Sequence, residues 1–298
     1  MGSLVDTMLT DPDSFSKRYY VLQRDVSLSG KLETFIEKYH EYQLYGLDEK
    51  TAFEQAYKEA DYKISRDTIK KALNKPDVKV YLDILRQASG KQIIPKDLYN
   101  TAERVCKSLR TSSHTKQWFG GKPGEGVEIF YQYGVIFPVT TVEDGVLERE
   151  KVQHDCKGLL DLLVVDHTQK KIFPIDLKTT SKLFDFESSF LRFRYYIQAA
   201  FYTKAVEEAV KAGLLPDYDI QNFQFVVQDS EGWNPPLIFE VSPKTLRAGR
   251  YGGTVNGEYY KGFEELLKEL HWHKTSGYWD MPKQYADSDF KISLNVFS

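Results

Sequence analysis

The most constraining feature of this chain is a pair of apolar runs, each carrying one aspartate, joined by a short polar segment. Residues 158–180 read GLLDLLVVDHTQKKIFPIDLKTT. Two apolar runs with polar residues between them predict a β-hairpin, and the polar residues place its loop at 167–170. The position of the loop then fixes which side chains of the two strands face each other.

Counting back from this loop brings two carboxylates together. Asp166 faces Lys171, and along the same ladder Asp161 falls directly opposite Asp176. Cross-strand neighbours have Cβ atoms about 4.5–5.5 Å apart, and two carboxylates at that separation repel each other unless a cation lies between them. Because side chains at i and i+2 of a strand share a face, Lys178 points the same way as Asp176.

Two neighbouring carboxylates and a lysine are typical of metal-dependent phosphodiester hydrolysis. A hard cation such as Mg²⁺ takes two carboxylates, while water and substrate phosphate oxygens complete its octahedron. Lys178 is suited to orient or deprotonate a water, or to stabilise charge on the phosphorus oxygens. The alternative is that Asp161 and Asp176 merely end their strands and that Lys178 is solvated, since short patterns arise often by chance.

A helix is predicted after the hairpin, over about residues 195–211, and Gly213 ends it. Gln198 and Tyr202 are four residues apart, so they stand on one face of this helix. Arg192 and Arg194 lie just before the helix and are candidates for contact with DNA phosphates.

Together these residues resemble the PD-(D/E)XK nuclease superfamily, in particular its RecB-like exonuclease branch. Pro174-Ile175-Asp176-Leu177-Lys178 stands at the position of the name-giving motif, preceded by Gly158-x-x-Asp161 and followed by Gln198-x-x-x-Tyr202. The closest resemblance is to phage-type RecE-like nucleases (exodeoxyribonuclease VIII and lambda-exonuclease-like enzymes). Residues 2–9 and 12–15 look like the opening of that group, and Glu128, after a glycine loop, is similar to its upstream glutamate.

The resemblance implies a metal site that binds one or two Mg²⁺ or Mn²⁺ ions. Asp161 and Asp176 would hold the metal, with the backbone carbonyl of Leu177 as a further ligand. Glu128 and Asp6 would bind the metal directly or complete a second metal position. Asp6 stands where the family usually has a histidine ligand, and an aspartate still binds either ion.

The same resemblance gives roles to the remaining site residues. Lys178 would position the attacking water, and Gln198 and Tyr202 would line the site and orient Lys178 or the scissile phosphate. It also implies an α/β fold with a restriction-endonuclease-like core, in which a central mixed β-sheet is flanked by helices. We expect one nuclease domain over residues 1–298. In it, residues 101–298 form the core, joined by residues 1–27, and residues 28–100 form a helical insertion.

Composition limits the partners and cofactors only broadly. The net charge is −3, from 40 basic and 43 acidic residues, so a nucleic-acid partner would need a local basic groove. Lys70, Lys71 and Lys75 form either a solvated face or a rim that contacts DNA. The two cysteines cannot supply a four-cysteine zinc site or an iron–sulfur cluster. The chain has no apolar run long enough for a bilayer and no signal-peptide pattern, so we expect it in the cytoplasm, that of the host if phage-encoded.

The expected activity is metal-dependent DNA hydrolysis, as an exonuclease on double-stranded ends in phage-type recombination, repair or replication. The resemblance also implies a homo-oligomer and a single-strand-annealing partner protein. Two alternatives remain: a structure- or site-selective endonuclease on the same core, and a DNA-binding scaffold without catalysis. The intact acid pair argues against the scaffold, because adjacent carboxylates without a cation cost stability.

Overall fold

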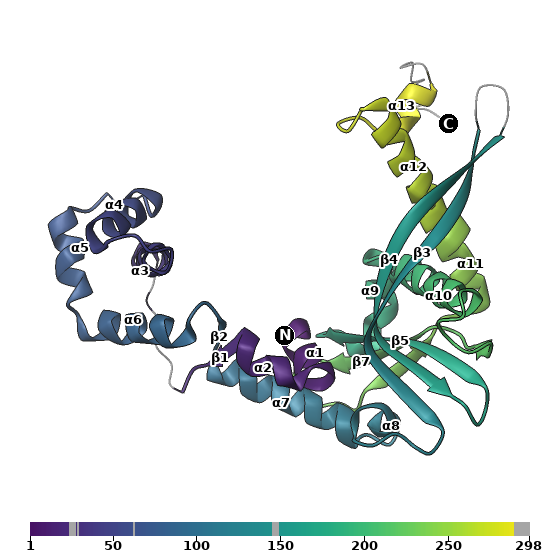
Figure 1. Ribbon diagram of the computed structural model, residues 1–298, viewed down its shortest axis with the longest axis horizontal. Coiled ribbons are helices and arrows are strands. Elements are labelled where there is room, and N and C mark those ends of the chain that lie inside the picture. The colour runs from purple at the N-terminus through teal and green to yellow at the C-terminus, as the bar shows by residue number, and fades with distance from the viewer. Residues whose placement is uncertain (24–27, 29, 62, 145–148, 289–298) are drawn as a thin grey trace. The chain divides into compact units, whose positions relative to one another are not determined.

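The chain folds into two compact units (Figure 1). The computed structural model describes residues 1–23, 28, 30–61, 63–144 and 149–288. The first unit holds Met1 and residues Ser3–Arg104, and the second holds Gly2 and residues Val105–Ser298. The first unit thus includes residues 3–23 together with the helical region, and the expected domain organisation stays a prediction. Among the residues described, no helix has the length and apolar character needed to cross a membrane.

The first unit is mainly helical, as the sequence predicts. Two short strands pair in parallel, with Tyr19 opposite Gln92. The elements are α1 (Gly2–Thr10), α2 (Pro12–Arg18), β1 (Tyr19–Val21), α3 (Lys31–Leu44), α4 (Glu49–Glu59), α5 (Arg66–Leu73), α6 (Pro76–Ala88), β2 (Gln92–Ile94) and α7 (Lys96–Thr111). The boundary between the two units falls within α7.

Apolar residues three and four positions apart form the core of this helical unit. Helices α3, α4, α5 and α6 all contribute to one cluster, which includes Phe35, Ile36, Ala52, Phe53, Ile69, Val78 and Leu82. Local capping sets where two of the helices begin. The Asp48 carboxylate accepts hydrogen bonds from backbone N–H groups at the start of α4, and the Ser65 hydroxyl does the same at the start of α5.

The second unit is built on a mixed β-sheet flanked by helices, which agrees with the α/β class expected. Its strand order is β3-β4-β5-β7-β8, and β6 pairs with β5. Among the described pairs of this sheet, β5 with β7 and β5 with β6 are parallel and the others are antiparallel. The strands are β3 (Val127–Asp144), β4 (Arg149–Asp166), β5 (Lys171–Thr180), β6 (Asp219–Ile220), β7 (Gln224–Asp229) and β8 (Leu237–Glu240).

Helices cover both faces of this sheet. The other elements of the unit are α8 (Lys116–Phe119), η1 (Leu183–Asp185), α9 (Phe186–Arg192), α10 (Tyr195–Lys211), α11 (Pro243–Tyr251), β9 (Gly253–Val255), β10 (Glu258–Tyr260), α12 (Phe263–Ser276) and α13 (Lys283–Asp287). Helix α10 packs on β3, β4 and β5 and is itself covered by α11 and α12 (Figure 1). On the opposite face, the Tyr131 hydroxyl of β3 donates to the carbonyl of Trp118 in α8.

Helix α10 has the bounds that the sequence predicts, and its small side chains bring it close to its neighbours. Ala199, Ala200 and Ala205 are buried. Ala205 lies over Gly158 of β4, whereas Ala200 faces Gly249 of α11. Gly249 of α11 lies so near α10 that an added Cβ would be 2.1 Å from the carbonyl oxygen of Tyr196. This tight packing holds the first turns of α10 in a fixed position over the sheet.

Candidate active site

The β4–β5 hairpin has the register that the sequence predicts. Asp166 pairs with Lys171 and Val165 pairs with Ile172, so residues 167–170 form the loop. The Asp166 carboxylate fixes the loop by accepting hydrogen bonds from the backbone N–H groups of Thr168 (2.9 Å) and Gln169 (2.8 Å). The last paired position before the site is Leu162 with Ile175.

The next position along this ladder brings Asp161 to Asp176. Oδ2 of Asp161 accepts a hydrogen bond of 3.0 Å from the backbone N–H of Leu177, which ties its carboxylate to the adjoining strand. The negative charge of Asp161 acts directly on Asp176 and raises its pKa. The two carboxylates are therefore close neighbours, as the hairpin register predicts.

Asp176 is the most deeply buried acid of the site, with 1% of its surface exposed. Its Oδ1 accepts a hydrogen bond of 2.6 Å from Nε2 of Gln198 on α10. The ammonium of Lys178 lies 2.6 Å from Oδ2, so the two side chains form a largely buried ion pair. Burial, and then the charge of Asp161, raise the pKa of the Asp176 carboxyl to about 7, against the opposing effect of Lys178.

Lys178 lies two residues beyond Asp176 on the same face of β5. Its side chain is 20% exposed, so it is the member of the pair that solvent reaches. The ammonium also lies over two aromatic rings, 4.8 Å from the centroid of Tyr195 and 5.8 Å from that of Phe225. Burial alone would lower the pKa of Lys178, but the Asp176 carboxylate outweighs it and holds that pKa above its usual value. Lys178 is therefore a cation at neutral pH.

Gln198 and Tyr202 bring α10 to the acid pair. Burial raises the pKa of the Tyr202 hydroxyl, and the charges of Asp176 and Asp161 raise it further, while a hydrogen bond with Gln198 opposes them. The Tyr202 ring packs over the backbone of Gly158, where an added Cβ would lie 3.5 Å from it. The five residues expected to be catalytic are thus brought together by β4, β5 and α10.

The aromatic support beneath Lys178 is a feature that the sequence reasoning missed. From the sequence, Tyr195 is only the first residue of the helix predicted over 195–211, and no local pattern links Phe225 to the acid pair. Phe225 pairs with Asp176 across the parallel β5 and β7 strands. The register of β5 and β7 places Phe225 beside Asp176. The sequence could have predicted this position only if β5 and β7 had been known to be neighbours.

Other residues expected at the metal site lie elsewhere or in the other unit. Glu128 pairs in register with Val165, four residues from Asp161 along β4, or about 13 Å at the usual strand rise. Its carboxylate lies 3.5 Å from His167 at the loop end of the hairpin, so the structure does not bring it to the acid pair. Asp6 belongs to α1 in the helical unit, and its role as a ligand stays a prediction.

The arginines expected to contact DNA are exposed beside the site helix. Arg192 ends α9, with its guanidinium 5.5 Å from the ring centroid of Phe193. Arg194 is the residue before α10 and has a left-handed backbone conformation, with φ of 56°. Their exposure suits contact with an anionic ligand, and their role stays a prediction.

The acid pair fits a divalent cation. Apart from the ammonium of Lys178, the buried Oδ2 of Asp176 has no donor among the described residues, so it can also bind an ion. Two adjacent carboxylates also repel each other, and a bound cation would relieve that repulsion. Outside the gaps at 24–27, 29, 62, 145–148 and 289–298, no three acidic, histidine or cysteine side chains gather as a metal site. Water and substrate oxygens would therefore supply the other ligands, which is the usual situation for Mg²⁺.

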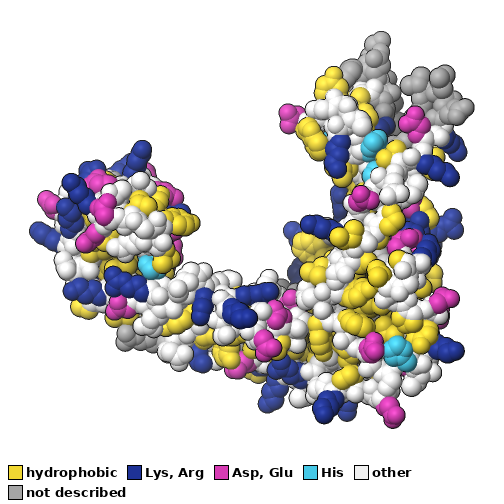
Figure 2. Space-filling model, viewed as in Figure 1, with side chains coloured by type: hydrophobic (Ala, Val, Ile, Leu, Met, Phe, Trp, Pro, Cys, Tyr) yellow, Lys and Arg dark blue, Asp and Glu magenta, His cyan; other side chains and the backbone are white. Residues whose placement is uncertain are grey.

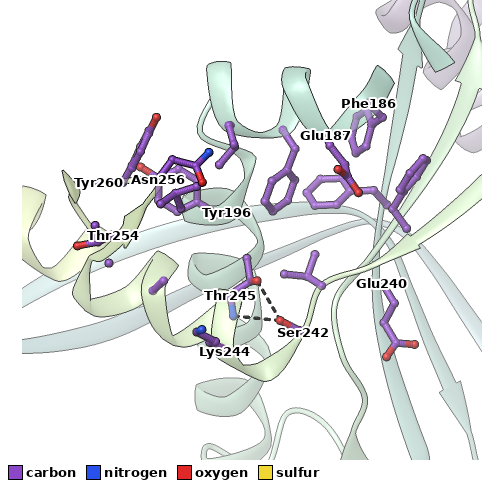
Figure 3. Close-up of a pocket in the computed structure, with 18 residues that line it drawn as sticks. Phe186, Glu187, Tyr196, Glu240, Ser242, Lys244, Thr245, Thr254, Asn256 and Tyr260 are labelled. Carbon is purple, nitrogen blue, oxygen red and sulfur yellow. Dashed lines mark hydrogen bonds between the residues drawn. The ribbon is translucent and has the colours of Figure 1, made fainter. Parts of the chain in front are cut away.

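A cavity of about 650 Å³ adjoins the site and shares Phe225 with it (Figure 3). Its wall is mainly aromatic and aliphatic, and it lies between α9, β8 and α11. Ser242 and Thr245 hydrogen-bond to each other at its rim, as the cap of α11 (Figure 3). None of the residues that line it is Asp161, Asp176 or Lys178. We therefore assign the chemistry to the acid pair and not to this cavity.

Comparison with known proteins places this chain in no family. No protein-family model matches it, and no curated protein does. Among solved structures, it matches a crystal structure described as "Putative exonuclease" from Eubacterium rectale, with 10% identity and a TM-score of 0.37. The match covers 91% of this chain and 79% of that one. A TM-score of this size does not carry a functional argument, so the function rests on the site residues.

Proposed function

We propose that this protein is a divalent-metal-dependent deoxyribonuclease that hydrolyses phosphodiester bonds at the ends of double-stranded DNA. The observation that carries the proposal is the set of Asp161, Asp176 and Lys178, in which two adjacent carboxylates, one of them buried, lie beside a single ammonium. A structural role for this set is disfavoured, because two adjacent carboxylates with one lysine leave a charge uncompensated.

The residues have distinct parts in this hydrolysis. Water adds to phosphorus and releases a proton to solvent, one P–O ester bond breaks, and the leaving oxygen takes up a proton from solvent. Asp161 and Asp176 would hold Mg²⁺ or Mn²⁺, which would supply Lewis-acid stabilisation of the charge that develops on the phosphate oxygens. Lys178 stays protonated, because its pKa is raised, so it donates hydrogen bonds to the attacking water or to a phosphate oxygen. Gln198 keeps the Asp176 carboxylate in place through its hydrogen bond of 2.6 Å.

The test compares linear duplex DNA labelled at its ends with a covalently closed circle. With Mg²⁺ or Mn²⁺, we expect the linear form to be lost while the circle stays intact, and EDTA to stop the reaction. The Asp176→Asn variant should be inactive and folded, and Asp217→Asn, at an exposed position, is the matched control. Cutting of the circle would favour an endonuclease on the same site. If wild type and Asp176→Asn are equally inert with both metals, the catalytic proposal is wrong.

A further inference from the structure

The basic part of the helical unit is residues 63–79, which hold α5 and the start of α6. This segment contains six Lys or Arg and two Asp, a net charge of +4, whereas the whole chain carries −3. Lys and Arg side chains are frequent on the visible surface of the helical unit, with fewer acidic side chains among them (Figure 2). A local positive charge of this kind attracts a polyanion even when the whole protein is acidic.

Helix α5 is fixed to α4 by side chains on its inner side. Ile69 is its buried residue, 2% exposed. Arg66 pairs with Glu54 at an N–O distance of 2.9 Å, and its guanidinium lies 4.5 Å from the ring centroid of Tyr57. The Tyr57 hydroxyl donates a hydrogen bond of 2.6 Å to the carbonyl of Ile64, in the connection between the two helices. The orientation of α5 is therefore set by the unit itself.

The lysines on the outer side of this segment are not neutralised. Lys71, in the last turn of α5, and Lys75, at the start of α6, are both exposed. Within the part of the chain that the structure describes, neither forms an ion pair. By contrast, Lys31 and Lys38 of α3 pair with acids at 3.2 and 2.9 Å. Lys71 and Lys75 would thus contact a phosphate without first giving up an existing partner.

The major groove of duplex DNA can admit α5. With its side chains an α-helix is about 10–12 Å in diameter, and the groove is about 12 Å wide. Helix α5 follows α4 after a connection of six residues, 60–65, and its outer side is polar and exposed. Thr68 and Asn74 are exposed on this segment, where Thr68 shares a hydrogen bond with Ser65 and the Asn74 amide donates one to the carbonyl of Lys70.

We propose that the exposed side of α5 is a binding surface for duplex DNA, with Lys71 and Lys75 on the phosphates. The surface consists of different residues from the candidate active site, so the inference does not depend on the proposed hydrolysis. It gives the helical unit a function of its own, which is to hold DNA irrespective of cleavage.

The experiment measures DNA binding by the full chain carrying Asp176→Asn, in EDTA, so that the DNA stays intact. Fluorescence anisotropy with a labelled 30-base-pair duplex gives Kd at several salt concentrations. Adding Lys71→Gln and Lys75→Gln should lower the slope of log Kd against log salt by about 1.8, since each phosphate contact contributes about 0.9. Extrapolated from 1 M salt, where the two proteins should bind equally, this difference in slope corresponds to a Kd raised about 30-fold at 0.15 M salt. Lys268→Gln with Lys274→Gln on α12 is the control of equal charge, and it should change neither quantity.

Three results would overturn the inference. The first is a slope and a Kd that the Lys71 and Lys75 substitutions leave unchanged, while circular dichroism shows the variant folded. The second is an equal loss of affinity in the α12 control. The third is equal, lysine-dependent binding of duplex RNA, whose narrow major groove excludes a helix. A wild-type protein that does not cut DNA, but binds it through α5, would refute the proposed hydrolysis and leave this inference standing.

Discussion

Replacing Asp176 by asparagine should separate the cost of its buried charge from its role in the site. The folded state raises the pKa of Asp176 from 3.8 to about 7, chiefly through burial. Stability that comes from the protonated carboxyl is therefore complete below about pH 4 and is lost as the pH rises through about 7. Asparagine keeps the shape of the side chain but cannot ionise, so the variant lacks this loss.

The magnitude follows from the size of the pKa shift. At about 1.36 kcal/mol per pKa unit, ionising Asp176 in the metal-free protein costs about 4 kcal/mol of unfolding free energy at pH 8, as an upper bound. Between pH 5 and pH 8, the stability of Asp176→Asn relative to wild type should rise by about 3 kcal/mol. Any packing cost of the substitution is the same at each pH and cancels from this comparison.

The assay is urea unfolding in EDTA at pH 5, 6, 7 and 8, on wild type, Asp176→Asn and the exposed control Asp217→Asn. Repeating it with Mg²⁺ should stabilise wild type at pH 8, by about 2.7 kcal/mol at a hundredfold excess over Kd, and leave Asp176→Asn unchanged. The reasoning is refuted if the difference between Asp176→Asn and wild type stays constant from pH 5 to pH 8.

Three further changes test the site and its support. Lys178→Met should reduce DNA cleavage at least about 100-fold while Mg²⁺ still stabilises the protein, and cleavage near the wild-type rate would remove Lys178 from the chemistry. Arg192→Gln with Arg194→Gln should lower the salt slope of DNA binding by about 2, and leave single-turnover cleavage at saturating DNA unchanged. Gly249→Ala should lower the melting temperature, because its Cβ would lie 2.1 Å from the Tyr196 carbonyl oxygen; overpacking costs about 1–3 kcal/mol and outweighs the gain of about 1 kcal/mol in helix propensity. A melting temperature at or above wild type would contradict this packing.

The hairpin could be predicted because its determinants are local. The polar residues 167–170 between two apolar runs set the loop, and a period of two residues then placed Lys178 beside Asp176. The helix over 195–211 could be predicted equally well, because its sequence pattern and the glycine that ends it lie in one short segment. Local patterns of this kind specify a structure without knowledge of the rest of the fold.

The rest depends on contacts between distant segments. Strand β1 pairs with β2, which lies some seventy residues later in the chain. No local sequence pattern predicts a parallel pair of strands that is only three residues long. Residues 1–27 therefore could not be assigned to a unit from sequence. The glutamate similar to the family's upstream acid, Glu128, lies near the start of a strand that runs to Asp144, and its distance from Asp161 follows from the pairing of the whole strand.

The turn fixed by the Asp166 carboxylate sets the register of β4 and β5, and the candidate site depends on that register. A strand that slips by one residue presents its opposite face. A slip of β5 by one residue against β4 would therefore turn Asp176 and Lys178 away from Asp161 and bring side chains of the opposite face, such as Leu177, into their place, although every site residue would still be present in the sequence. The geometry of the candidate site thus depends on a surface turn that contributes no residue to it.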